Sequence, residues 1–343
     1  MLRKRVRLVV LVVVVALVAL TLGFTYVDRS VTVGVYFYVW YSSDGRHWDP
    51  SMDPAWAVVE QPVIRFYDSR DERVIRWQLK LIKDAGVDFI VISWWGPGSF
   101  EDEAAKAVIK HLRKYGLKFA ILVEPYLGNE PALYNRSFWE NTTRYIRVNY
   151  IEPYGDLYFH LHGKPLILAF NPIGLSYRPD ADFPEFTIRI TGNDIDNAKY
   201  QDWDYWPDYL LHSDSVELRV RRDNMVSIIP RYCDIHFRTP GACLDPDLTQ
   251  GFYRKQWEWI LRNADKVSIV MITSWNEYHE RTQIEPSFSN QTADPWFLYN
   301  KTKEYIALLR RRSTMINLVV VTVLVFIAAI VMKHALGFIK KIV

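Results

Sequence analysis

The chain has 343 residues, a length that suits one large domain with appended segments. Its net charge of +3 is small and its Lys and Arg residues are scattered, which argues against a nucleic-acid-binding protein. Aromatic residues make up 15% of the chain, with 13 Trp and 21 Tyr, and this content suits either a large aromatic core or stacking against sugar rings.

The chain begins with a short basic tail and a long apolar run. Residues 1–7 carry Arg3, Lys4, Arg5 and Arg7, and residues 8–27 are uncharged and mostly apolar. Because about 20 apolar residues span a bilayer as a helix, we predict a transmembrane anchor at 8–27. A cleaved signal peptide is the alternative, but the apolar run is long and no small-x-small cleavage site follows it.

Residues 31–311 alternate strand and helix patterns. We predict strands at 31–40, 87–94, 117–123, 165–170, 186–190, 216–220, 226–229 and 267–272, and helices at 73–85, 101–115, 137–150, 250–264 and 297–311. Repeated strand–helix units predict an α/β fold, a (β/α)8 TIM-type barrel. A doubly wound sheet is the alternative, but it requires a Gly-rich phosphate loop, which the sequence lacks.

A second uncharged run, residues 313–332, predicts another transmembrane anchor, followed by a basic tail at 333–343. The positive-inside rule places both tails in the cytoplasm and the domain on the external side of the cell membrane, although residues 310–312, all Arg, argue the other way. A barrel is entered and left at the face opposite its catalytic loops. We therefore expect the active site to face away from the membrane.

Two cysteines and four sequons bear on the compartment. Cys233 and Cys243 flank a Pro-Gly turn, and they form either a disulfide or two free buried thiols. Their spacing does not match a zinc site. Asn-x-Ser/Thr sequons at Asn135, Asn141, Asn290 and Asn300 are candidate glycosylation sites.

The strongest chemical signal lies in residues 267–286. An apolar strand pattern ends in a polar and aromatic cluster that includes Glu277, His279 and Glu280. Two carboxylates in one cleft drive their pKa values apart, so one serves as an acid and the other as a base. Glycosidic-bond cleavage needs this division. A solvated helical turn with two unrelated Glu residues is the structural alternative.

Other predicted strands also end in polar and aromatic residues. Trp94 and Trp95 follow the second strand, Glu124 and Tyr126 follow the third, and Tyr205 follows the fifth. Because barrel strands end at one shared rim, we expect these side chains to gather there, with Glu124 as a ligand-binding residue. His160 and His162 lack a carboxylate partner at metal-binding spacing, so no metal is predicted.

Residues 274–286, S-W-N-E-Y-H-E-R-T-Q-I-E-P, closely resemble the signature of glycoside hydrolase family 99, the endo-α-mannosidase family. Residues 94–98 and 124–126 also match the family's pattern, in the expected order, and residues 38–48 look like a shortened version of its first strand loop. The resemblance covers nearly all of the chain between the predicted anchors.

The resemblance implies a barrel enzyme that cleaves within α-mannosides with retention, without metal or cofactor, through a 1,2-anhydro sugar. By position, Glu277 is the base that assists the 2-hydroxyl of the sugar, and Glu280 is the acid and then the base for water. The implied sugar-binding residues are Tyr41, Trp94, Trp95, Glu124, Tyr126 and His279 within the matched motifs, and His162 and Tyr205 by a looser alignment outside them.

Two residues depart from the family pattern. Tyr278 stands where the family usually has Trp, and Arg281 stands where it usually has Gly. An arginine beside the acid is expected either to lower the pKa of the acid or to bind an anionic group of the substrate. A transglycosylase with the same carboxylate pair, or a glycan-binding protein without activity, are the alternative functions.

Overall fold

The computed structural model describes residues 31–49, 51, 58, 60–128, 130–170, 177–192, 201–205, 207, 216–236, 238–244, 251–289, 293–312 and 322. The chain divides into a large unit, Thr32–Ala307, and a second unit composed of Met1–Val31 and Leu308–Val343. The predicted anchors at 8–27 and 313–332 lie outside the described residues, apart from Thr322. Within the described part of the chain, no helix has the length and apolar character that a membrane crossing requires.

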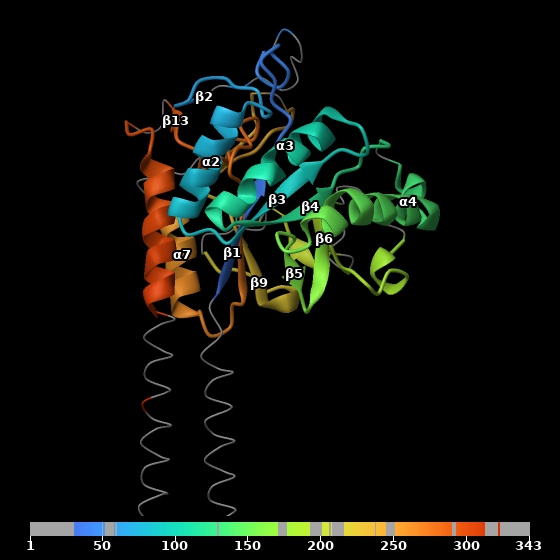
Figure 1. Cartoon of the computed structure of the whole chain (residues 1–343). Helices are drawn as coiled ribbons and strands as arrows, with labels where there is room; N and C mark the ends of the chain where they lie inside the picture. Colours follow the sequence, from blue (N-terminus) through green and yellow to red (C-terminus); the bar gives the residue numbers. More distant parts are fainter. Residues whose placement is uncertain are drawn as a thin grey trace, which may run out of the picture. The chain divides into compact units, whose positions relative to one another are not determined.

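The large unit is built on a parallel sheet, with eight strands in its described part (Figure 1). The hydrogen-bonded order is β8-β7-β6-β4-β3-β1-β12-β9, and β8 and β9 lie beside each other, so the sheet is nearly closed. This arrangement confirms the predicted barrel. The strands are β1 (Thr32–Phe37), β3 (Phe89–Trp94), β4 (Lys118–Val123), β6 (Lys164–Phe170), β7 (Thr187–Gly192), β8 (Trp203–Asp204), β9 (Met225–Ile228) and β12 (Ile269–Ile272).

Helices lie outside the strands, close to where the sequence predicts them (Figure 1). They are α2 (Glu72–Asp84), α3 (Phe100–Tyr115), α4 (Arg136–Ile146), α5 (Glu152–Tyr154) and α7 (Phe252–Arg262), and residues 297–312 are also helical. In α3 the Ser99 side chain accepts a hydrogen bond from the backbone N–H of Asp102, and Gly116 ends the helix with a φ of 60°. Its buried residues include Ala104, Val108 and Leu112, which recur every four positions and so form one face that packs on the barrel.

Two features of the sheet differ from the sequence prediction. The predicted strand at 216–220 is wrong: these residues form no strand, and only Leu218 among them is buried. Their alternating pattern therefore reflects one buried side chain rather than a sheet position. Strand β8 was not predicted, because two residues carry no periodic signal. Short antiparallel pairs join β2 (Gln61–Pro62) to β13 (Ser287–Phe288), β5 (His160–Leu161) to β6, and β10 (Tyr232–Cys233) to β11 (Cys243–Leu244).

Alternation along each strand decides which side chains enter the barrel. In β3, Phe89 and Val91 belong to the core that fills the barrel, and Ser93, two residues further, contacts Glu124. Trp94 has the opposite orientation, and its indole N–H donates to Asp102 of α3. The interior is tight, because a Cβ atom at Gly34 would lie 2.5 Å from the Phe89 ring.

Candidate active site

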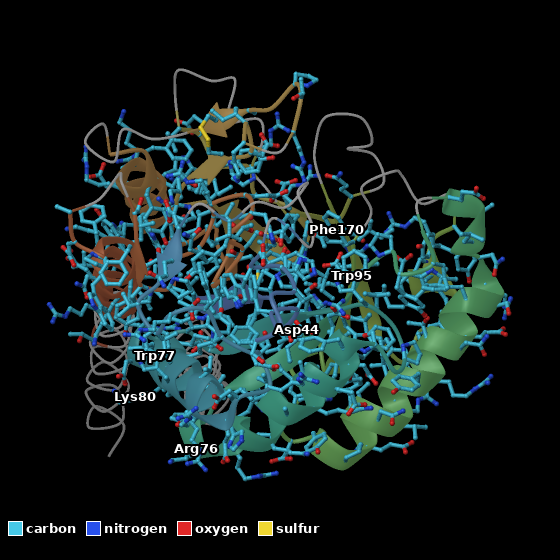
Figure 2. All side chains as sticks on the ribbon, turned by 90° about the horizontal axis from the view of Figure 1, so that it is seen from above. Asp44, Arg76, Trp77, Lys80, Trp95 and Phe170 are labelled. Atoms are coloured by element: carbon cyan, nitrogen blue, oxygen red, sulfur yellow. A yellow bond between two sulfur atoms is a disulfide. The ribbon has the colours of Figure 1, made fainter. Side chains whose placement is uncertain are left out.

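A pocket of about 130 Å³ lies where the barrel strands end. Parallel strands deliver their carboxyl ends to one rim, so residues far apart in the sequence meet there. In the view of Figure 2 from above, Trp95 and Phe170, which follow or end two different strands, lie near each other, and both line this pocket. The lining residues are Tyr38, Trp40, Trp95, Glu124, Pro125, Phe170, Tyr205, Arg238, Glu277 and Glu280.

The loop after β12 holds Glu277 by backbone and side-chain hydrogen bonds. The backbone N–H of Glu277 donates to Ser274 Oγ over 2.8 Å. Its Oε1 accepts from the backbone N–H of His279 (2.8 Å) and lies 3.0 Å from His279 Nδ1. Asn276 fastens the loop to the end of β1 through both Tyr38 backbone groups, each over 2.8 Å. Glu277 is therefore a fixed, buried hydrogen-bond acceptor.

Glu280 lies in the same pocket and is also buried. Arg238 Nη2 donates to its Oε1 over 2.8 Å, and its backbone carbonyl accepts from Cys233 N–H over 2.9 Å. Burial raises the pKa of Glu280 to about 8, the Glu277 carboxylate adds to the increase, and Arg238 opposes it. At neutral pH the Glu280 carboxyl is therefore mostly protonated and able to give up a proton.

Glu124 supplies a third carboxyl from the end of β4. Ser93 Oγ donates to it over 2.8 Å. Burial raises the pKa of Glu124 to about 8; the Ser93 hydrogen bond opposes the increase, and Glu277 adds to it. A protonated carboxyl here can both donate to and accept from a sugar hydroxyl. Within the described residues, no three His, Cys, Asp or Glu side chains cluster in a way that would hold a metal ion.

Several known proteins with a similar sequence or fold are named as endo-α-mannosidases. No protein-family model matches the sequence. The rat glycoprotein endo-α-1,2-mannosidase is 23% identical over 356 aligned positions, covering 82% of this chain and 74% of the relative. A human glycoprotein endo-α-1,2-mannosidase-like protein is 24% identical over 333 positions, covering 77% and 70%. The structure of the family 99 endo-α-mannosidase from Bacteroides thetaiotaomicron matches with a TM-score of 0.59 at 18% identity, covering 83% of this chain and 98% of that one. These similarities support the assignment of the chain to glycoside hydrolase family 99. The chain is an endo-acting glycoside hydrolase.

The structure separates the predicted sugar-binding residues of this glycoside hydrolase into two groups. Trp95, Glu124 and Tyr205 line the pocket, whereas Trp94 and Tyr126 are not among the residues that line it. The rings of Trp94 and Tyr126 pack against each other at 5.5 Å, and the Tyr126 hydroxyl pairs with Thr142 of α4. Trp94 belongs to the outward-facing side of β3, so the strand that delivers Trp95 to the pocket turns Trp94 away from it.

Tyr41 and His279 are buried supports rather than pocket-lining residues. The Tyr41 hydroxyl donates to the backbone carbonyl of Asn276 over 2.8 Å, and its ring stacks on Trp48 at 3.8 Å. His279 is fully buried and contacts Glu277 through two nitrogen atoms. Both residues therefore hold the loop that carries Glu277, a role that their position in the sequence motif did not distinguish from sugar binding.

His162 lies at the other end of the barrel. It precedes β6, in the turn after β5, and its Nε2 is 2.7 Å from Asp223 Oδ1, just before β9. Its side chain is 62% exposed. The structure does not bring His162 to the pocket, because a residue before a parallel strand lies at the amino edge of the sheet.

The two departures from the family pattern also point away from the pocket. The hydroxyl of Tyr278 donates to the buried Glu285 carboxylate over 2.9 Å. Arg281 pairs with Glu60, with its Nη2 2.8 Å from Glu60 Oε1. The structure places the Arg281 guanidinium against Glu60 rather than against the neighbouring acid, and its φ of 56° is in the left-handed region. Arg238 occupies the place beside Glu280.

Sequence reasoning missed Arg238 because it lies 42 residues from Glu280. The signal available was the pair of cysteines that flank it. The structure joins Cys233 and Cys243 in a disulfide, which closes the hairpin that carries Arg238.

Of the sequon residues, Asn135, Asn141 and Asn300 are exposed, and Asn290 lies outside the described residues.

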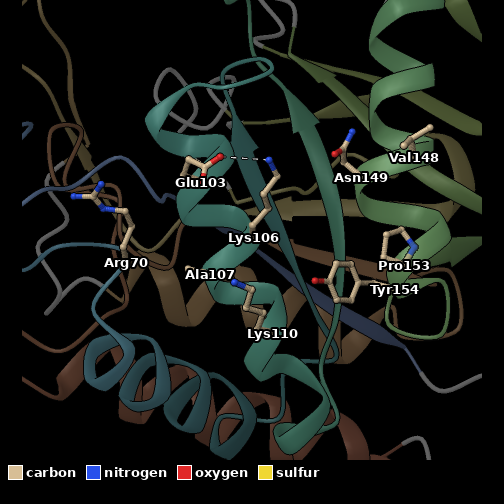
Figure 3. A pocket seen from close by; sticks show the side chains of 9 residues that line it. All are labelled: Arg70, Glu103, Lys106, Ala107, Lys110, Val148, Asn149, Pro153 and Tyr154. Carbon is tan, nitrogen blue, oxygen red and sulfur yellow. Dashed lines mark hydrogen bonds and ion pairs between the residues drawn. The ribbon is translucent and has the colours of Figure 1, made fainter.

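A second, more open pocket lies on the outer surface, beside α3 (Figure 3). It is lined by Arg70, Glu103, Lys106, Ala107, Lys110, Val148, Asn149, Pro153 and Tyr154. Figure 3 shows the interaction of Lys106 with Glu103, and Lys106 also pairs with the buried Asp102. None of the titratable residues that line this pocket is buried, unlike Glu124, Glu277 and Glu280 at the rim of the barrel, so it does not share the features that mark the first pocket as the catalytic site.

Proposed function

We propose that this glycoside hydrolase cleaves α-mannosidic linkages inside a glycan, with retention, using Glu277 as base and Glu280 as acid. The supporting observation is the shared pocket, in which Glu280, buried and with its pKa raised by that burial to about 8, lies with Glu277, whose Oε1 already accepts from the backbone N–H of His279. Aromatic rings of Tyr38, Trp40 and Trp95 supply flat apolar walls for sugar rings. The mannosidase relatives named above make α-mannose the substrate to test first.

The reaction proceeds in two steps in which protons and bonds balance. In the first, Glu277 takes the proton of the sugar 2-hydroxyl, the 2-oxygen bonds to C1, the C1–oxygen bond to the leaving sugar breaks, and Glu280 protonates that leaving oxygen. In the second, water bonds to C1 and gives a proton to Glu280, while the C1–O2 bond breaks and O2 recovers its proton from Glu277. Two inversions at C1 give retention.

A panel of α-linked manno-oligosaccharides tests this proposal on the full-length enzyme in detergent. We expect cleavage of an internal α-mannoside, and Glu277→Gln and Glu280→Gln variants that lose roughly 10²-fold or more of kcat, as acid–base catalysis predicts. NMR of the fresh product reports the anomer. An inverted product, or full activity in either variant, would refute the assigned roles.

We also propose that the enzyme is anchored in the cell membrane with its catalytic domain outside. The support is the pair of apolar runs at 8–27 and 313–332, the basic tails beyond them, and the Cys233–Cys243 disulfide, a bond typical of oxidising compartments. Protease added to intact cells should digest the catalytic domain and leave tags on both tails protected. Digestion of the tags in intact cells would contradict the orientation.

A further inference from the structure

Arg238 is held by a compact hairpin. Strands β10 and β11 pair antiparallel, and the disulfide joins Cys233 to Cys243 across them. Inside the loop, Asp234 accepts from the backbone N–H of Ala242 over 2.6 Å and from Arg238 Nη1 over 2.9 Å. The loop turns tightly, because a Cβ atom at Gly241 would lie 2.7 Å from the backbone of Ile235.

The guanidinium of Arg238 connects this hairpin to the proposed acid. Its Nη1 donates to the Tyr232 hydroxyl over 2.7 Å and to Asp234, and its Nη2 donates to Glu280 Oε1 over 2.8 Å. The hairpin backbone makes a second connection, from Cys233 N–H to the Glu280 carbonyl. Arg238 thus reaches Glu280 with one arm of its planar fork while the hairpin holds the other.

We propose that Arg238 is a positioning residue for Glu280: it fixes the direction of the carboxyl group and stabilises the carboxylate left after Glu280 gives up its proton. This inference rests on the proposed function, in which Glu280 alternates between acid and base. A fixed cation favours the first step, because it stabilises the charged form that Glu280 becomes, and in the second step it holds that carboxylate in the direction from which it takes a proton from water.

The charges around Glu280 show why one cation matters. The titratable groups that face it are Glu277 from its own loop, Asp234, Tyr232 and Arg238 from the hairpin, Tyr205 from the end of β8 and Glu124 from the end of β4. Among the described residues that line the pocket, Arg238 alone is a cation. Burial, Glu277 and Asp234 raise the pKa of Glu280, and Arg238 limits that increase.

The pH dependence of kcat/KM in Arg238 variants of the full-length enzyme tests the proposal. In the wild type the rate should fall above about pH 8, where Glu280 loses its proton. Arg238→Gln should move this alkaline limb upward by about one pH unit or more, and lower kcat roughly 10- to 100-fold, as loss of a charged hydrogen bond predicts. Arg238→Lys, which keeps the charge but not the fork, should restore the limb and only part of kcat.

Arg73→Gln is the matched control. Arg73 is an exposed arginine that pairs with Asp71 at the start of α2, so this variant should keep the wild-type limb and kcat. An Arg238→Gln variant with lowered kcat and an unmoved limb would overturn the proposal, since it would show a structural role or a substrate contact alone. An Arg238→Lys variant with the kcat of the wild type would show that Arg238 does not orient Glu280. If Arg238→Gln fails to fold, Arg238→Lys still tests the orienting role, and a kcat equal to that of the wild type would overturn it.

Failure of the proposed function has a different signature. If the alkaline limb persists in Glu280→Gln, Glu280 is not the group that titrates, whatever the Arg238 variants show. If Glu280→Gln abolishes the limb and Arg238→Gln leaves it in place, the acid is correct and only the role of Arg238 is refuted.

Discussion

Replacing Glu60 with Gln should destabilise the fold more than removal of a typical surface charge. The Glu60 side chain is 1% exposed and accepts hydrogen bonds from two arginines, Arg231 and Arg281, and from Ser289 Oγ over 2.7 Å. Burial on its own would raise the pKa of Glu60, but the two guanidinium groups hold it below its usual value. Glu60 is therefore a buried anion between two cations, and Arg281 follows Glu280 directly.

Glu60→Gln leaves both arginines buried without their counter-charge. Breaking a buried ion pair from one side costs about 3–5 kcal/mol. For a domain of this size, each kcal/mol shifts Tm by roughly 2–4 °C, so the melting temperature should fall by about 6–20 °C. Circular dichroism during thermal and urea unfolding measures both quantities. Glu72→Gln is the control, since Glu72 pairs with Arg76 on the surface of α2 and should lose less than about 0.5 kcal/mol.

The pH dependence gives a second check on Glu60. A carboxyl group whose pKa is lowered by folding adds stability above its unfolded pKa, near 4.3 for Glu, and loses it as the pH falls through the folded value. The free-energy difference between wild type and Glu60→Gln should therefore be full at pH 7 and shrink below about pH 4. A loss under about 1 kcal/mol at pH 7, or a difference that stays constant down to pH 3, would refute this reasoning.

Three other outcomes follow from the placement of single residues. Cys233→Ser combined with Cys243→Ser should lower the free energy of unfolding by up to about 3 kcal/mol, the chain-entropy contribution expected for a loop of this length. It should also reduce kcat, because the hairpin then holds Arg238 loosely. Reduction of the wild type with dithiothreitol should reproduce both effects, and an unchanged melting curve would contradict the estimate. Trp95→Ala should raise KM with little change in Tm, whereas Trp94→Ala should cost about 3–5 kcal/mol of stability, so equal melting curves for the two would show that their orientations are misassigned. His162→Gln should leave kcat and KM unchanged, and a raised KM would place His162 in a sugar subsite after all.

Long periodic segments made the barrel predictable from the sequence. The predicted helix at 101–115 corresponds to α3 (Phe100–Tyr115), and the predicted strand at 87–94 contains β3 (Phe89–Trp94). Both have a repeating apolar pattern with clear ends. The two-residue strand β8 has no such pattern, and its place is set by pairing with β7. The apolar pattern of a segment therefore predicts the helices and strands that bury a face of their own. It does not predict a short strand such as β8, which forms only because a neighbouring strand pairs with it.

The residues of the candidate site also differ in how far the local sequence predicts their place. Glu277, Glu280 and Glu124 were predictable because each follows a buried strand, and parallel strands end at one rim. The contacts of the residues beside these carboxyl groups are harder to predict. They depend on the local backbone conformation, and a single residue can turn its side chain away from the pocket. Arg281 is next to Glu280 in the sequence, yet its left-handed backbone turns the guanidinium to Glu60. The cation that does reach Glu280 comes from a hairpin 42 residues earlier, held by a disulfide. Adjacent charge in the sequence is thus a poor guide to the electrostatics of this acid, because side-chain contact with Glu280 is decided by the fold of a distant segment.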